Sequence, residues 1–281
     1  MGPPASPHIV DVLIADRLGP LMRSRAWPLI RPVLYALLDY KKARKLADDL
    51  APLSGEQAVA HVSRMLSLQL EVTGLEHVPA HGRLLIVATH PTGPSDGIAI
   101  FDALAPVRRD LHFYANSETL LFAPGLEGTV IGIEWRPERR TREQARAAVV
   151  QTRALFERGH ALFIFPSGRL SRRTKRGLAD WPWQRSALAL SRKHDAPVLP
   201  IYLSGPRTRW VEVLGRLFPA VKDVTLFHEF LNTRGKRFKV VIGPVIPRAA
   251  LEGDELETTE ALQRYVETVL PSDAGAAFSM S

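Results

Sequence analysis

The chain has 281 residues, of which 46% are hydrophobic, and it carries a formal net charge of +8. This composition predicts a folded protein with a large core and argues against disorder. The absence of cysteine from the sequence excludes disulfides, a thiol nucleophile and cysteine-bound zinc, and it fits a reducing compartment.

The positive charge is unevenly distributed along the chain. Residues 250–281 hold seven acidic side chains and one basic side chain, Arg264, so the remainder carries a net charge of +14. The strong positive charge of residues 1–249 favours an anionic partner: a nucleic acid, an acidic membrane surface or a phosphorylated substrate. No apolar stretch is long enough to span a bilayer, and the first residues lack the pattern of a signal peptide. We therefore expect a cytoplasmic protein.

Residues 1–70 are predicted to form an N-terminal helical segment, with helices over 9–21, 27–50 and 55–70. The second helix combines apolar residues with a basic cluster, which is typical of a helix that lies on a membrane surface. The alternative is a helix that packs on the body of the protein and leaves a charged end in solvent. The apolar residues are Trp27, Leu29, Ile30, Leu34 and Leu37, and the basic ones are Lys41, Lys42, Arg44 and Lys45.

Residues 71–270 alternate between predicted strands and helices, which indicates an α/β domain with a mixed sheet flanked by helices. Thr141 and Gln144 form a capping box before a helix over 142–158, and Gly159 ends that helix. Residues 271–281 are expected to be a disordered tail. The predicted strands are 83–89, 111–115, 129–134, 161–166, 197–203, 224–231 and 237–243, and further helices are expected over 98–104, 184–194 and 255–270.

One loop has the residues of a general base. His90 follows the predicted strand 83–89, and Asp96 stands six positions later, just before an apolar helix start. The loop thus lies at the carboxyl end of a strand, where open α/β sheets place their sites. A histidine whose second ring nitrogen is held by a carboxylate is suited to accept a proton near neutral pH. The simpler alternative is an ordinary loop histidine beside a helix-capping aspartate.

A second loop has the residues of an anion site. The predicted strand 161–166 runs into a turn that contains Ser167, Gly168, Arg169 and Arg172. Backbone amides of such a turn, together with arginine side chains, are suited to bind a phosphate. The alternative is a solvated basic loop.

These segments resemble the glycerolipid acyltransferase superfamily, including its hemolysin-like and lyso-ornithine-lipid acyltransferase branch. The resemblance covers about residues 70–245. It differs from the usual family pattern in two places: five residues rather than four separate His90 from Asp96, as in the hemolysin-like branch, and Ser167 replaces the usual glutamate. The segments that carry the resemblance are the loop 90–96, Asn116-Ser117-Glu118, Phe165-Pro166-Ser167-Gly168-Arg169 and Pro197-Val198-Leu199-Pro200.

The resemblance implies an O-acyltransferase that moves a fatty acyl group from acyl-CoA or acyl carrier protein to the hydroxyl of a lyso-lipid, with no further cofactor. The lyso-lipid is a lysophospholipid, lysophosphatidic acid or lyso-ornithine lipid, taken from an anionic membrane surface. His90 is then the general base, oriented by Asp96. The expected substrate-binding residues are Gly93, whose turn amides support the oxyanion, and Asn116, Ser167, Gly168, Arg169 and Arg172.

Two other classes of function remain open at this point. Gly93-Pro94-Ser95-Asp96-Gly97 matches the nucleophile elbow of a serine esterase, with His160, His194 or His228 to complete a triad. Against it, Ser95 lies far past the end of its strand, and Pro94 restricts the turn. The basic clusters also permit a non-enzymatic protein that binds anionic membranes. We expect neither nucleic-acid binding nor a metal site, since the basic residues do not lie on a recognition helix and His77 and His81 lack further ligands.

Overall fold

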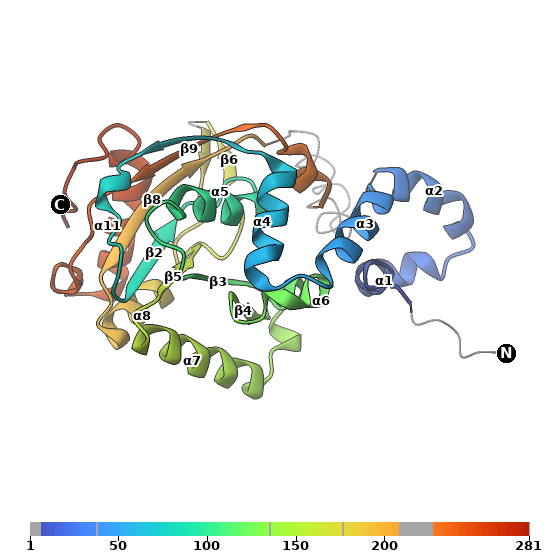
Figure 1. The fold of residues 1–281 in the computed structure, drawn as a ribbon, viewed down its shortest axis with the longest axis horizontal. Coiled ribbons are helices and arrows are strands. Elements are labelled where there is room, and N and C mark those ends of the chain that lie inside the picture. The colour runs from blue at the N-terminus through green and yellow to red at the C-terminus, as the bar shows by residue number, and fades with distance from the viewer. Residues whose placement is uncertain (1–6, 38, 135, 176, 208–226, 281) are drawn as a thin grey trace.

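The computed structural model describes residues 7–280, except residues 38, 135, 176 and 208–226. A mixed sheet lies at the centre with helices on both faces, and the first three helices form a lobe at one side (Figure 1). The predicted α/β class is therefore confirmed. The helices are α1 (Ile9–Met22), α2 (Trp27–Leu37), α3 (Tyr40–Leu50), α4 (Gly55–Leu66), α5 (Pro94–Leu104), α6 (Glu118–Phe122), α7 (Arg142–Glu157), α8 (Ser186–His194) and α11 (Glu255–Arg264), with a π-helix, η5 (Tyr265–Val269), and four short 3₁₀ turns, η1 (Leu75–His77), η2 (Pro124–Leu126), η3 (Pro137–Arg139) and η4 (Arg248–Leu251).

The large sheet has seven strands in the order β1-β9-β8-β2-β5-β3-β4, and a separate hairpin pairs β6 with β7. Within the large sheet only the β8–β9 pair is antiparallel. The carboxyl ends of β2, β3, β4, β5 and β8 therefore meet at one edge. The strands are β1 (Gln69–Thr73), β2 (Leu84–Ala88), β3 (Leu111–Asn116), β4 (Val130–Ile133), β5 (Ala161–Ile164), β6 (Arg172–Thr174), β7 (Gly177–Ala179), β8 (Val198–Ser204) and β9 (Arg237–Ile242).

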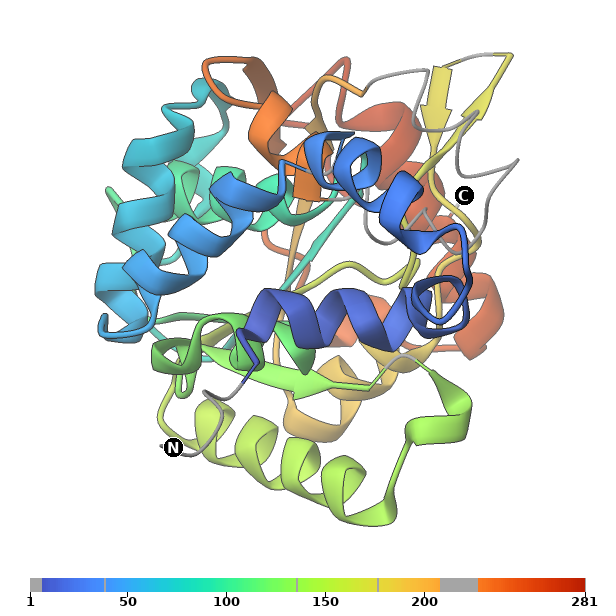
Figure 2. The same ribbon diagram turned by 90° about the vertical axis from the view of Figure 1, so that its right-hand side faces the viewer.

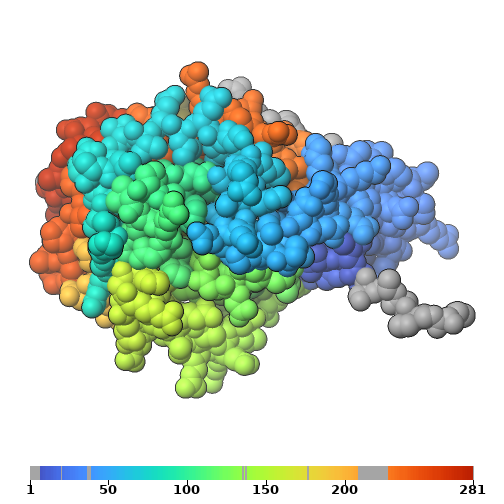
Figure 3. Space-filling model, in the orientation of Figure 1, coloured from blue at the N-terminus to red at the C-terminus, as the bar shows by residue number. Residues whose placement is uncertain are grey.

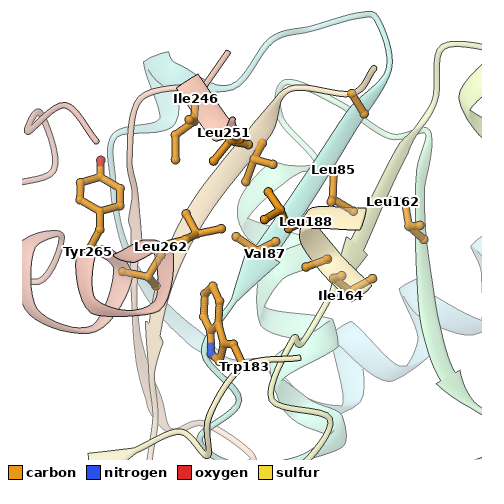
Figure 4. Packing of buried hydrophobic residues seen from close by; sticks show 14 of the residues in the cluster. Leu85, Val87, Leu162, Ile164, Trp183, Leu188, Ile246, Leu251, Leu262 and Tyr265 are labelled. Carbon is orange, nitrogen blue, oxygen red and sulfur yellow. The ribbon is translucent and has the colours of Figure 1, made fainter. Parts of the chain in front are cut away.

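Strand β2 shows why the sheet is covered on both faces. Its five residues are all buried, so it has no polar alternation and reads as a continuous apolar run. Leu84 and Ile86 pack with α5 on one face, whereas Leu85 and Val87 pack with α7, α8 and α11 on the other. Figure 4 shows the second of these clusters, with the ring of Trp183 inside it.

Helices α1, α2 and α3 form the N-terminal lobe, which projects from the body (Figure 3) and stands in front of the sheet when viewed from its own side (Figure 2). One helix was predicted over 27–50, but Asp39 adopts a left-handed conformation (φ 51°) and separates α2 from α3. Leu34 is buried, and Trp27 and Ile30 pack with it inside the lobe. Leu29 and Val33 instead remain 80% and 69% exposed. The side chain of Leu37 lies outside the described part.

Three further expectations about the elements are wrong. Residues 227–231 of the expected strand 224–231 are helical, and its first three residues lie outside the described part. The end of the expected helix 55–70 is instead strand β1, which joins the N-terminal segment to the sheet. Residues 271–280 of the expected disordered tail pack on the core, where Phe278 meets Tyr265 edge to face and the Tyr265 hydroxyl donates to the Ala276 carbonyl over 2.6 Å.

Other expectations agree with the structure. Thr141 and Gln144 form the predicted capping box at the start of α7, and Gly159 follows its end with φ 74°. None of the helices in the described ranges is both long and apolar enough to cross a membrane.

Candidate active site

The structure places the predicted loops at one edge of the sheet. His90 follows β2, Phe165 follows the neighbouring strand β5, and Asn116 ends β3, the next strand along. The rings of His90 and Phe165 are stacked, with centroids 3.9 Å apart and planes 10° apart. The strand order therefore brings the histidine loop and the arginine loop into direct contact.

The His90–Asp96 loop is built around one carboxylate. Asp96 lies in the first turn of α5 and has no exposed surface. Its Oδ2 lies 2.8 Å from Nδ1 of His90 and accepts the backbone N–H groups of Thr92 (2.9 Å) and Gly93 (3.0 Å), while Oδ1 bonds to the Thr92 hydroxyl. Gly93 makes this turn possible, because its φ of 121° is open only to glycine, and Pro94 begins the helix with a suitable φ.

These hydrogen bonds define the tautomer of His90. The two backbone amides donate to Oδ2 of Asp96, so this oxygen acts as an acceptor and Nδ1 of His90 donates its proton to it. The neutral ring then carries a lone pair on Nε2. Within the described residues Nε2 has no hydrogen-bond partner, and 15% of the side chain is exposed. His90 is thus arranged as a base that can take a proton from a bound group.

The same contacts correct the expected role of Gly93. The turn amides around Gly93 were expected to support an oxyanion, and the amide of Gly93 itself donates to Asp96 instead. Its contribution in this structure is to hold the carboxylate that orients His90.

The geometry also argues against the serine esterase. Ser95 is buried in α5, and its hydroxyl lies 2.7 Å from Oγ1 of Thr233, whose own proton goes to the carbonyl of Phe230. The three histidines proposed for a triad bond elsewhere or lie apart: His160 bonds to His112, His228 bonds to Asp39, and His194 packs on Phe156. Among the described residues no histidine contacts the Ser95 hydroxyl, so the structure does not support a serine esterase that uses Ser95.

The arginine loop is ordered by its own short-range contacts. The Ser167 hydroxyl donates to the carbonyl of Arg169 over 2.7 Å, and Gly168 takes the left-handed conformation that this turn needs (φ 60°). Arg169 and Arg172 are exposed and both lie over the ring of Trp181, at 5.6 and 4.7 Å from its centroid. Neither has a carboxylate partner in the described ranges. Two guanidinium groups on an aromatic platform are suited to bind an anionic group.

Asn116 belongs to a different cluster. Its side chain accepts the backbone N–H of Glu118 over 3.1 Å, and Glu118 is ion-paired with Arg17 of α1 and with Arg136. Arg136 also pairs with Asp16 of α1 at 2.7 Å. Within the described part Asn116 has no contact with His90 or Asp96. This cluster attaches the N-terminal lobe to the edge of the sheet that holds the site.

Asp180 is the residue that sequence reasoning missed. It follows β7 and is buried, and its carboxylate accepts the backbone N–H of His90 (3.2 Å), the hydroxyl of Ser171 and the indole N–H of Trp183 (3.0 Å). Burial raises the pKa of the Asp180 carboxyl above its usual range. The signal available in the sequence was an aspartate close to two tryptophans, Trp181 and Trp183, but only the fold shows that it is buried and meets His90.

No three or more His, Asp or Glu side chains gather as a metal-binding group in the described ranges.

Residues 69–204, which contain both loops, match the family model described as Acyltransferase. A lyso-glycine lipid O-acyltransferase from Phocaeicola vulgatus is 26% identical over 211 residues, covering 73% of each chain. A protein of the same name from Bacteroides thetaiotaomicron is 25% identical over 211 residues, covering 73% of this chain and 75% of that one. The 1-acyl-sn-glycerophosphate acyltransferase from Thermotoga maritima aligns in structure with a TM-score of 0.47 and 15% identity, over 95% of this chain and 94% of that chain.

Proposed function

The chain belongs to the glycerolipid acyltransferase superfamily, and we propose that it transfers a fatty acyl group from an acyl thioester to the hydroxyl of a lyso-lipid, with His90 as the general base. The relatives that carry the name lyso-glycine lipid O-acyltransferase support a lyso-lipid as the acceptor. The observation that carries the proposal is the His90–Asp96 pair. Asp96 accepts a hydrogen bond from Nδ1 of His90, so Nε2 is available to accept a proton from the substrate.

The proposed reaction is a single displacement. A lipid hydroxyl is scarcely ionised at neutral pH, so Nε2 of His90 removes its proton as the oxygen attacks the thioester carbonyl. The tetrahedral intermediate then breaks its C–S bond, and the imidazolium returns the proton to the departing thiolate. Asp96 keeps the tautomer and stabilises the imidazolium, as the buried carboxylate does in serine hydrolases. Base catalysis of this kind contributes about 10²–10⁴-fold to the rate.

The arginine loop supplies binding in this proposal. Arg169 and Arg172 hold an anionic group of one substrate, either the headgroup of the lyso-lipid or a phosphate of acyl-CoA or acyl carrier protein. The support is their exposure, their shared platform on Trp181 and their position next to Phe165, which stacks on His90. No cofactor beyond the acyl donor takes part in these steps.

We also propose that the protein is peripheral, on the inner, cytoplasmic face of the membrane, and that α2 contacts the bilayer. Leu29 and Val33 are the most exposed large apolar side chains of the described residues, and both lie on the projecting lobe (Figure 3). Exposed basic residues of α3, including Lys41, lie close to them in the chain. An acceptor that resides in the bilayer requires a site that reaches its surface.

The proposed function is tested by lipid mass spectrometry of cells that lack or overproduce the chain. A lyso-lipid should accumulate in the first and its acylated product in the second. Purified protein with a panel of lyso-glycine lipid, lyso-ornithine lipid and lysophosphatidic acid, each with acyl-CoA and acyl carrier protein, then identifies both substrates. Unchanged lipids together with no transfer to any member of the panel would refute the proposal.

A further inference from the structure

The segment from Asp180 to Trp183 connects parts of the chain that are distant in sequence. Ser171 and Asp180 flank the β6–β7 hairpin, and the bond between their side chains closes its base. On the other side, the backbone N–H of Asp180 donates to Glu267 of the π-helix η5 over 2.7 Å. The segment therefore lies between the two loops of the site and the C-terminal helix.

Gln263 of α11 holds the rest of this segment. Its Oε1 accepts the backbone N–H of Trp183 over 2.9 Å, and its Nε2 donates to the carbonyl of Trp181 over 3.2 Å. Gln263 and Glu267 are four residues apart, so they reach the segment from neighbouring turns. Both lie outside residues 69–204, the span matched by the family model.

His90 is held twice in this arrangement, by its ring and by its backbone. Asp96 orients the ring, as described above. The backbone N–H donates to Asp180 over 3.2 Å, and the backbone carbonyl accepts the N–H of Ser171 over 2.8 Å. Since Ser171 also donates its hydroxyl to Asp180, the three residues form a closed ring of hydrogen bonds.

We propose that Asp180 is a positioning residue for the acyl transfer, which anchors the backbone of His90 to the arginine loop and is itself supported by Glu267 from the C-terminal helix. This inference rests on the proposed function of His90. A buried carboxylate makes strong hydrogen bonds to N–H and O–H donors, and all three of its donors would be left without a partner if it were removed. Misplacement of a catalytic group by 1 Å costs roughly 10²-fold in rate.

The proposal predicts a separation of kcat from KM. Trp181, the platform of the two arginines, is held by Gln263 and not by Asp180. Loss of the Asp180 carboxylate should therefore disturb His90 more than the arginines. Asp180→Ala leaves the N–H groups of His90 and Trp183 and the hydroxyl of Ser171 without their acceptor, whereas an asparagine could keep its Oδ1 bonded to both His90 and Ser171.

The test compares four purified full-length variants with the wild type by steady-state kinetics. Asp180→Ala should lower kcat by about 10-fold or more, with KM for the donor and the acceptor changed by less than about 3-fold. Glu267→Ala should lower kcat by a smaller factor, whereas Glu267→Gln, which retains the acceptor oxygen, should restore it. Asp102→Asn removes a different carboxylate, which is bonded to Ser63 on the α4 side of the protein, and should leave kcat unchanged.

Amide hydrogen exchange provides a readout that does not depend on activity. In Asp180→Ala the backbone amide of His90 should exchange faster, while amides of the β2 core keep their protection and thus report a folded protein. A folded Asp180→Ala with wild-type kcat and unchanged exchange at His90 would overturn the proposal. Faster exchange in a protein whose wild type transfers no acyl group would instead uphold the anchoring and refute the proposed reaction.

Discussion

The imidazole of His90 is stacked on the ring of Phe165, with centroids 3.9 Å apart and planes 10° apart. This contact joins the loop after β2 to the loop after the neighbouring strand β5. Together with the bond from Nδ1 to Asp96, it holds the ring both at one edge and on one face. The His90 ring is therefore preorganised before any substrate binds, as the proposed proton transfer requires.

Arg169 should be needed for binding rather than for chemistry. A lysine retains its positive charge but lacks the planar fork that binds a carboxylate or phosphate through two bonds. We expect Arg169→Lys to raise KM for one substrate by about 10-fold, equivalent to about 1.4 kcal/mol, with little change in kcat. Arg173→Lys, in strand β6 just after this loop, serves as the control. An unchanged KM for both donor and acceptor would show that Arg169 binds neither substrate and belongs to a solvated basic loop.

Membrane binding should depend on two exposed side chains of α2. The double variant Leu29→Ser, Val33→Ser removes apolar area that is worth about 1.5–3 kcal/mol per side chain when buried. We expect co-sedimentation with anionic vesicles to fall at least 10-fold and the remaining binding to weaken with salt. The electrostatic part should be modest, because Lys42 and Lys45 are already paired with Asp39 and Asp49.

The matched control for that experiment is Val149→Ser, Val150→Ser, since these valines are also exposed but lie on α7 of the body. It should bind vesicles as the wild type does. Equal binding of the α2 variant would place the membrane contact elsewhere and assign the N-terminal lobe to packing alone.

The attachment of α1 should be sensitive to acid. Hydrogen bonds from Arg139 and Arg136 lower the pKa of Asp16 from 3.8 to about 2. The folded protein thus holds fewer protons than the unfolded chain, so this pair contributes stability above about pH 4 that is lost as the pH falls toward 2. Asp16 is partly exposed, so we expect at most about 1 kcal/mol.

Urea unfolding of Asp16→Asn against the wild type measures this contribution. The difference in the free energy of unfolding should be present at pH 7 and should shrink at pH 2.5. Asp49→Asn, which breaks an exposed pair within α3, should show little difference at either pH. A pH-independent difference for Asp16→Asn would contradict the ion-pair explanation.

Arg108 should be the arginine on which the fold depends. Its side chain is fully buried, pairs with Asp110 at 2.7 Å and donates to the carbonyls of Pro79, Gly82 and Gly159. Arg108→Lys leaves several of these acceptors without a donor and should lower the free energy of unfolding by about 3 kcal/mol. The exposed neighbour Arg109→Lys should change it by less than about 0.5 kcal/mol. Equal effects of the two substitutions on urea unfolding would contradict this role.

The sequence alone is enough to predict the local part of the site. His90 and Asp96 lie on one short strand–loop–helix unit, where an apolar run, a glycine, a proline and a helix start determine the geometry together. The same holds for the arginine turn after β5. Residues that meet through the fold are not predictable in this way: Asp180 is 90 positions from His90 in sequence, and Glu267 is 87 from Asp180.

The errors in the predicted elements have physical causes of the same kind. Residues 227–232 include phenylalanines that pack on the helical cluster of α4, so tertiary packing decides a segment whose apolar run is ambiguous. Strand β1 is short and mostly exposed, and only its pairing with β9 defines it. The break at Asp39 carries no proline or glycine, and the contact of Asp39 with His228, far away in sequence, accompanies it.

The most direct test of the account is acyl transfer from a radiolabelled acyl thioester to the preferred lyso-lipid by three variants. His90→Ala should lose transfer by about 10²–10⁴-fold while remaining folded, Asp96→Asn should lose it substantially because the tautomer is no longer held, and Ser95→Ala should retain most of it. Full activity in His90→Ala, or loss of activity in Ser95→Ala with a labelled acyl-serine in the wild type, would contradict His90 as the base of a single displacement.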